Sequence, residues 1–172
     1  MGVCLHASAV NVSGKAILFL GHSTAGKSTI SRLLSEHYPV IADDKVWVYQ
    51  TKNGCWMVSD GSDNFRAGNG SERPVGRDQY PLLAILRIFK SNTTHLDPIS
   101  RKETCKYLMD AIFEIDFQRR VEDLCKKKNW FFCSAEISRK IEGWGLTFKK
   151  DASIIKIIHD NFEKRFLLDM IT

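Results

Sequence analysis

Four residues near the start of the chain combine charges and hydroxyls in a pattern suited to phosphate chemistry. Lys27 and Ser28 follow directly after a glycine, and the acidic pair Asp43-Asp44 comes after the next predicted strand. An ammonium group can neutralise the β- and γ-phosphates of a nucleoside triphosphate, and a serine hydroxyl can bind Mg²⁺. Carboxylates can hold the metal or accept a hydroxyl proton. These residue types together predict phosphoryl transfer.

The loop that carries Lys27 has the spacing of a complete phosphate-binding loop, with four residues between Gly21 and Gly26. Glycines allow backbone conformations in which successive N–H groups point at phosphate oxygens, and the helix predicted from Lys27 adds its positive end. The residues expected to bind the nucleotide form one run: Gly21, His22, Ser23, Thr24, Ala25, Gly26, Lys27, Ser28 and Thr29. We expect the Lys27 ammonium to be exposed when the site is empty.

Strand, loop and helix are predicted in the order that such a loop requires. An apolar run at 16–20 indicates a buried strand before the loop, and Ile30 and Leu34 lie on one apolar face of the helix after it. The short apolar strand 39–42 ends in Asp43-Asp44. Because the carboxyl ends of strands in an α/β sheet open on one edge, we expect the acidic pair near the loop. Spacing alone does not decide which aspartate binds metal and which accepts the proton.

The rest of the chain predicts an α/β fold. Further strands are expected at 4–10, 45–50, 55–58, 82–86 and 144–148, with hairpin turns at Ser13-Gly14 and Asn53-Gly54. Helices are expected after a capping box at Ser100 and Glu103, over 117–136, and after a cap at Asp151. The glycine-rich stretch 60–79 predicts a lid that orders over the triphosphate or the acceptor, in which Arg66 or Arg73 contacts phosphate. The alternative is a long surface loop without this role.

Length and composition indicate one domain over residues 1–172, with 44% hydrophobic residues and a net charge of +5. This excess of positive charge is mild, and the lysines at 126–128 read as a solvated helix face, so no nucleic-acid partner is expected. No membrane span, signal segment or metal-ligand spacing of histidines is present in the sequence. The five cysteines are interpreted as mostly small buried residues of a protein in the reducing cytoplasm.

Several motifs resemble the catalytic domain of the HPr kinase/phosphorylase family. The segments concerned are LHASAV at 5–10, GKAILFLGHSTAGKST at 14–29, IADDKV at 41–46 and YPLLAILRIFKS at 80–91. The resemblance implies the nucleotide-binding fold of the HPr kinase and phosphoenolpyruvate carboxykinase type, with a phosphate loop, a mixed sheet and flanking helices. An antiparallel ribbon that leads into the phosphate loop agrees with this fold. The cofactors implied are ATP and Mg²⁺.

By position, the resemblance implies that Asp43 is the general base and that Asp44 supports Mg²⁺ together with Ser28. It also implies that His6 lies beside the acidic pair and orients it, while Lys27 meets the phosphates. The predicted activity is transfer of the γ-phosphate to a hydroxyl, with Ser of an unidentified protein or peptide as the favoured acceptor. Two alternatives remain: a small-molecule kinase, and a catalytically silent ATP-binding regulatory module. The sequence leaves the oligomeric state open, including a homo-oligomer.

Overall fold

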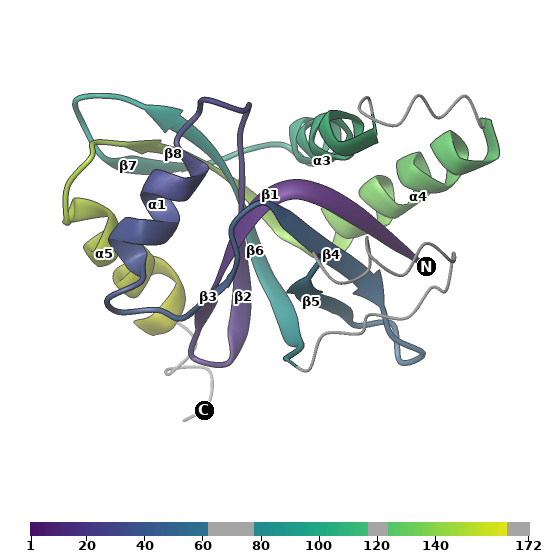
Figure 1. Cartoon of the computed structure of the whole chain (residues 1–172), viewed down its shortest axis with the longest axis horizontal. Coiled ribbons are helices and arrows are strands. Elements are labelled where there is room, and N and C mark those ends of the chain that lie inside the picture. The colour runs from purple at the N-terminus through teal and green to yellow at the C-terminus, as the bar shows by residue number, and fades with distance from the viewer. Residues whose placement is uncertain (62–77, 117–123, 165–172) are drawn as a thin grey trace.

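An eight-stranded mixed sheet with helices on both faces organises the chain, and the computed structural model describes residues 1–61, 78–116 and 124–164 (Figure 1). The strands are β1 (Gly2–Val12), β2 (Lys15–Leu20), β3 (Val40–Ala42), β4 (Lys45–Gln50), β5 (Trp56–Asp60), β6 (Tyr80–Lys90), β7 (His95–Pro98) and β8 (Glu142–Phe148). The helical elements are α1 (Lys27–Leu34), α3 (Arg101–Asp116), α4 (Leu124–Lys140), α5 (Ser153–Ile158) and the π-helix η2 (His159–Glu163). The prediction of a mixed sheet with flanking helices is confirmed.

The two longest strands, β1 and β6, hold the sheet together. The first half of β1 pairs antiparallel with β4, and its second half pairs antiparallel with β2 and β3. Strand β6 runs parallel to both β2 and β8, and its first residues pair antiparallel with β5. The antiparallel ribbon of β1 and β2, predicted from the sequence, is therefore present and leads directly into the loop before α1.

Both predicted hairpin turns are confirmed. Ser13 and Gly14 have positive φ angles of 49° and 84°, as a two-residue turn between twisted antiparallel strands requires. The N–H of Gly14 donates to Oδ1 of Asn11 at 2.8 Å. In the turn between β4 and β5, Gly54 has a φ of 80°. The turns fix the register of β1 with β2 and of β4 with β5.

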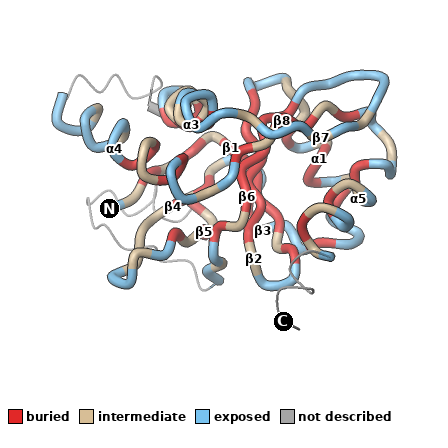
Figure 2. Tube along the Cα trace, turned by 180° about the vertical axis from the view of Figure 1, so that it is seen from behind, coloured by how far each residue is buried: buried red, intermediate tan, exposed pale blue. Residues whose placement is uncertain are grey.

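The sheet separates two apolar clusters. Residues of α3 and α4, such as Leu108 and Ile137, pack with one face of the sheet. Residues of α1, α5 and η2, such as Ile30, Ile154 and Phe162, pack with the other. The buried positions accordingly concentrate in the central strands, and the exposed ones on the helices and turns (Figure 2).

The predicted start of α3 is confirmed in detail. The N–H of Ser100 donates to Glu103 Oε2 at 2.9 Å, and the N–H of Glu103 donates to Ser100 Oγ at 3.2 Å, so the capping box is complete. At the start of α5, the N–H of Ser153 donates to Oδ1 of Asp151 at 3.0 Å. Asp151 therefore accepts from a backbone N–H at the start of the helix, but the N-cap residue of α5 is Ala152 rather than the predicted Asp151.

Several helix and strand boundaries differ from prediction, including those of β6 and α4. Strand β6 is longer than the expected 82–86, because its parallel neighbours β2 and β8 extend the pairing beyond the apolar run. Helix α4 continues past the predicted end at Glu136 to Lys140, and residues 117–123 of the predicted helix lie outside the described residues. Strand β7 was not predicted, because its pairing with β8 brings together segments far apart in the sequence.

The interpretation of the cysteines as mostly buried is wrong. None of the five forms a disulfide within the described residues, and only Cys133 is buried. Cys4 and Cys105 are half-buried, whereas Cys55 and Cys125 are exposed. Cys55 directly follows the Asn53-Gly54 turn, and Cys125 lies in the first turn of α4, so neither reaches the apolar clusters.

Candidate functional site

The loop from Gly21 to Gly26 joins β2 to α1 and depends on glycine at both ends. Gly26, at the N-cap position of α1, has a φ of 104°. Residues other than glycine rarely adopt this backbone conformation. A Cβ on Gly21 would lie 2.6 Å from Cβ of Ala25 and 2.8 Å from Cγ1 of Ile88, so close packing excludes a larger residue. The loop therefore requires glycine at both ends, and α1 begins directly after it.

The Lys27 side chain lies against this loop rather than in solvent. Its Nζ donates to the carbonyl oxygens of Gly21 at 2.6 Å and His22 at 3.3 Å, and the residue is only 5% exposed. The expectation of an exposed ammonium is therefore wrong, because loop carbonyls replace its water. Burial lowers the pKa of Lys27, and the nearby carboxylates of Glu114 and Asp44 partly oppose that effect.

A cavity of about 510 Å³ brings most of the predicted site residues together. It is lined by the second half of the loop, the start of α1, the acidic pair and two basic residues from other strands: Ser23, Thr24, Gly26, Lys27, Ser28, Thr29, Asp43, Asp44, His6 and Lys90. Gly21, His22 and Ala25 belong to the same loop but do not line the cavity. The chain thus gathers a lysine, hydroxyls and carboxylates around one space.

Pairing of β1 with its neighbours positions His6 beside the acidic pair. His6 opposes Lys45 in the β1–β4 register, and the N–H of Ala7 donates to the carbonyl of Asp44 at 3.2 Å. As a result, His6 Nε2 lies 3.3 Å from Asp44 Oδ1. The structure thus places His6 next to one of the two aspartates.

Glu114 of α3 joins this group, and the sequence did not single it out. His6 Nδ1 hydrogen-bonds to Glu114 Oε2, and His22 Nδ1 lies 3.2 Å from Glu114 Oε1. His6 therefore bridges two carboxylates, Glu114 and Asp44, through its two ring nitrogens. Glu114 is 108 residues from His6 in the chain, so no local sequence signal connects them.

The two aspartates differ in their surroundings. Asp44 contacts His6, whereas the Asp43 carboxylate forms no hydrogen bond or ion pair with any residue that the structure describes. Ser28 is exposed at the cavity and its hydroxyl is likewise unpartnered within the described part of the chain. Among the described residues, no group of three His, Cys, Asp or Glu side chains could hold a metal ion.

The predicted phosphate contacts Arg66 and Arg73, and most of the predicted lid, lie outside the described residues. Two other cations from β6 stand near the loop and were not foreseen. Lys90 lines the cavity and donates to the carbonyl of Thr24 at 2.7 Å. Arg87 is only 7% exposed, lies 4.8 Å from the Tyr107 ring centroid, and contributes to the lowered pKa of Lys27.

Within the described residues, the longest helices are too short or too polar to cross a membrane. No curated protein matches the sequence. The solved structure described as the HPr(Ser) kinase/phosphatase from Coxiella burnetii is similar at a TM-score of 0.47 and 13% sequence identity, over 98% of this chain and 99% of that chain. The family described as SynChlorMet cassette protein ScmC matches residues 1–147. Because this match spans most of the sequence, the chain belongs to the ScmC family.

Proposed function

We propose that this protein binds ATP with Mg²⁺ and transfers the γ-phosphate to a hydroxyl, with Ser of a protein or peptide as acceptor. The observation that carries the proposal is the single cavity at which the Gly21–Thr29 loop meets Asp43, Asp44 and His6. Each of these groups has a place in phosphoryl transfer, which depends on positioning and charge neutralisation. The motifs shared with the HPr kinase family support the same activity.

The loop and α1 suit a triphosphate. The N-terminus of a helix offers unpaired N–H groups and the positive end of its dipole, and Gly26 in its left-handed conformation turns the backbone there. Lys27 Nζ donates to the carbonyl oxygens of Gly21 and His22. Phosphate oxygens of a nucleotide would replace these carbonyl oxygens as hydrogen-bond acceptors. Lys90 adds a second ammonium at the cavity.

The cavity also suits Mg²⁺ held jointly by the protein and a nucleotide. Mg²⁺ is usually bound by one or two protein oxygens together with phosphate oxygens and water. The Ser28 hydroxyl and the Asp44 carboxylate line the same cavity and would supply the protein oxygens. When bound, the ion neutralises charge that develops on the phosphates.

Asp43 is the better candidate for accepting the proton of the incoming hydroxyl. Its carboxylate lines the cavity without a partner among the described residues, whereas Asp44 contacts His6. His6 is itself held by Glu114, so Asp44 has a fixed neighbour while Asp43 remains available to an acceptor. This division agrees with the roles that the family resemblance implies.

A comparison of two variants with wild type tests the function. Asp43→Asn keeps the shape of the side chain but cannot accept a proton, so ATP–Mg²⁺ binding should persist in calorimetry while γ-phosphate transfer falls by about 10²–10⁴. Asp44→Asn should instead raise the Mg²⁺ concentration needed for half-maximal activity. Transfer is followed with γ-labelled ATP, through label that appears in protein, peptide or inorganic phosphate.

Three results would change the proposal. The reverse pattern in the two variants would exchange the roles of Asp43 and Asp44. Label found only in a small molecule would identify a small-molecule kinase. ATP binding by the wild type without any release or transfer of label would identify a nucleotide-binding regulatory module.

A further inference from the structure

A groove of about 640 Å³ lies between α3 and α4, away from the nucleotide cavity. Its floor is formed mainly by uncharged side chains from both helices: Cys105, Met109, Phe131 and Ala135. Phe131 is 56% exposed, which leaves a large aromatic surface open to water. The groove therefore offers apolar area that the described chain does not cover.

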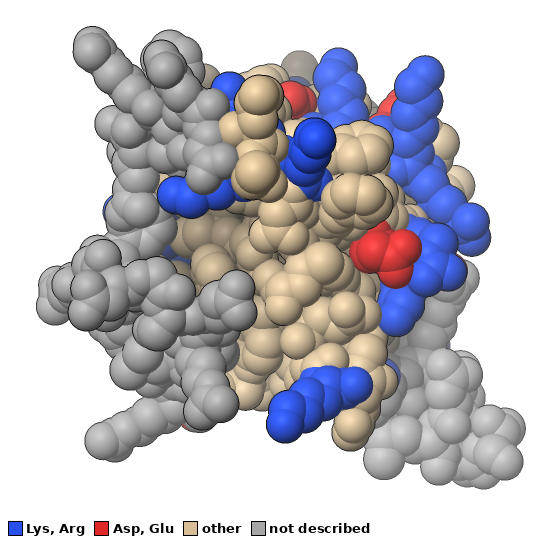
Figure 3. Space-filling model, turned by 90° about the vertical axis from the view of Figure 1, so that its right-hand side faces the viewer, with Lys and Arg blue, Asp and Glu red and all other residues tan. Residues whose placement is uncertain are grey.

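The rim of this groove is basic. Four cationic side chains line it, and none of the lining residues is acidic: Arg101, Lys102, Lys106 and Arg139. Arg139 pairs with Glu136 at 2.9 Å, while the other three form no ion pair within the described residues. At the end of the molecule where α4 lies, Lys and Arg side chains outnumber acidic ones around a largely uncharged surface (Figure 3).

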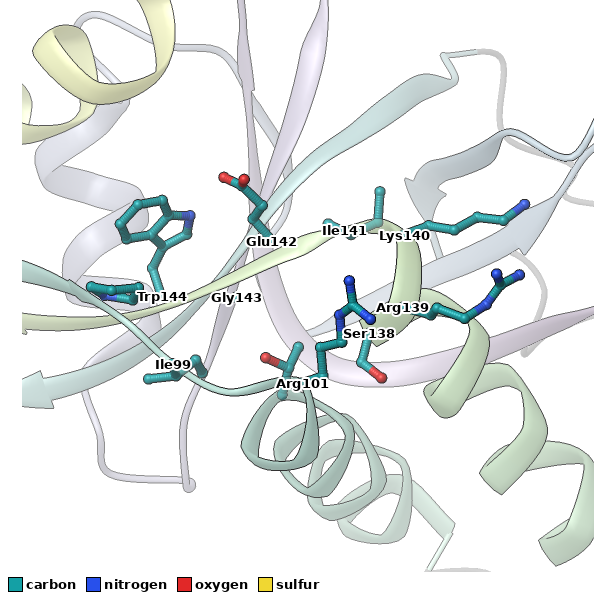
Figure 4. A pocket seen from close by; sticks show the side chains of 11 residues that line it. Ile99, Arg101, Ser138, Arg139, Lys140, Ile141, Glu142, Gly143 and Trp144 are labelled. Atoms are coloured by element: carbon teal, nitrogen blue, oxygen red, sulfur yellow. The ribbon is translucent and has the colours of Figure 1, made fainter.

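The basic character continues beyond the end of the groove. A second cavity of about 420 Å³ adjoins it between the start of α3, the end of α4 and β8 (Figure 4). Arg101, Ser138 and Arg139 line both spaces, and Lys140 lines the second. Glu142 is the one acidic residue on this second cavity. A chain lying along the groove would thus meet further positive charge at this end.

We propose that the groove between α3 and α4 binds an acidic amphipathic helix of a partner protein. Its apolar face would cover Met109 and Phe131, and its carboxylates would face the basic rim. A helix fits because a concave apolar channel between two helices accepts apolar side chains at helical spacing. An acidic partner fits because four cationic side chains and no acidic one line the groove.

Binding at this groove does not depend on the proposed nucleotide chemistry. The groove residues of α3 run from Arg101 to Met109, and Met109 lies about 8 Å along the α3 axis from Glu114, which contacts His6 of the nucleotide cavity. None of the groove residues lines the nucleotide cavity itself. A partner docked here leaves the phosphate loop open, so its affinity can be measured without ATP. Loss of ATP binding would therefore leave the docking proposal intact, and loss of docking would leave the kinase proposal intact.

The test uses two fluorescein-labelled helical peptides of 18 residues that share one leucine face and differ in carrying Glu or Lys on the flanks. Fluorescence anisotropy with the full chain should show the Glu peptide binding at least tenfold more tightly than the Lys peptide. Phe131→Ser and Lys106→Glu should each weaken binding at least fivefold. The matched controls are Phe132→Ser and Lys128→Glu, exposed residues of α4 that do not line the groove.

Several results would overturn this assignment. Equal affinity for the two peptides, or equal losses in the Phe131 and Phe132 variants that remain folded by circular dichroism, would exclude the groove as an acidic-helix site. Sedimentation of the protein with anionic vesicles that is lost in Phe131→Ser would assign the surface to a membrane. A dimer in analytical ultracentrifugation that Phe131→Ser dissociates would assign it to a second copy of this chain.

Discussion

At the scale of single residues, burial of the charged Lys27 side chain lowers the free energy of unfolding. Its side chain is 5% exposed, and burial lowers its pKa below the usual 10.5. A lysine whose pKa is lowered by folding disfavours the native state while it is protonated. This penalty disappears when the lysine loses its proton. The charge is retained because it serves the loop, where it binds the carbonyls of Gly21 and His22.

This burial gives Lys27 a defined effect on stability. The free energy of unfolding should rise as the pH rises from the lowered pKa of Lys27 towards 10.5, because the unfolded chain then binds more protons at this site. Lys27→Met should lack this contribution, which urea denaturation at several pH values would measure as a difference from wild type. Lys52→Met, at an exposed turn residue, should follow the wild type. A pH dependence equal in all three proteins would contradict the prediction.

Glu114 is expected to act by positioning His6. Glu114→Gln keeps the size of the side chain but removes the charge that faces both His6 and His22. Loss of this charged partner of His6 should lower the turnover number by about tenfold, equivalent to ~1.4 kcal/mol. The dissociation constant of ATP should stay within about twofold of the wild-type value. Asp110→Asn, one turn earlier in α3, is the control. A change in ATP affinity without a change in turnover would show that Glu114 serves only nucleotide binding.

At the scale of secondary-structure elements, the junction between β2 and α1 depends on its backbone conformation. Gly26 combines a φ of 104° with close neighbours, since a Cβ there would lie 3.0 Å from Cε of Lys90 and 3.0 Å from Cζ of Phe148. Gly14, in the turn between β1 and β2, has a φ of 84° and no atom within 4 Å of such a Cβ. A side chain at Gly14 would thus cause backbone strain alone, whereas a side chain at Gly26 would cause both backbone strain and steric conflict.

Alanine at these two positions should therefore have different effects. Gly14→Ala should cost about 1–2 kcal/mol of unfolding free energy, the strain of a left-handed residue. Gly26→Ala should cost more and should also weaken ATP binding, because the start of α1 must move. Urea denaturation and calorimetry measure the two quantities. Equal losses of stability with unchanged ATP affinity would show that the Lys90 and Phe148 side chains adapt freely.

At the scale of the whole molecule, one sheet lies between two apolar clusters. Leu108 in α3 belongs to one cluster and Ile154 in α5 to the other, and both are fully buried. Strands β1 and β2 contribute to both clusters, because their alternate side chains face opposite sides of the sheet. Unfolding of either side should therefore disrupt the other.

The expected consequence is a single cooperative transition. Leu108→Ala and Ile154→Ala should each lower the free energy of unfolding by about 2–5 kcal/mol. Tryptophan fluorescence and far-ultraviolet circular dichroism should report the same urea midpoint for each variant. Phe132→Ala, at a residue that is 63% exposed, should change stability little. Two separate transitions in either core variant would contradict the prediction of one domain over residues 1–172.

The sequence by itself determined the features that depend on neighbouring residues. The glycine spacing of the loop, the Ser13-Gly14 and Asn53-Gly54 turns, and the Ser100–Glu103 capping box are contiguous patterns whose conformations follow from local sterics and hydrogen bonding. The strand that ends in Asp43-Asp44 could be placed near the loop for a different reason, because the carboxyl ends of strands in an α/β sheet open on one edge.

Only the tertiary structure decided which distant side chains meet. Glu114 reaches His6 across 108 residues, because α3 packs on the sheet face near β1. The position of Lys90 depends on the parallel pairing of β6 with β8. The groove depends on the antiparallel contact of α3 with α4. The burial of Lys27 likewise follows from how the loop folds over its own side chain. Such contacts depend on the packing of many elements together, which no short sequence pattern encodes.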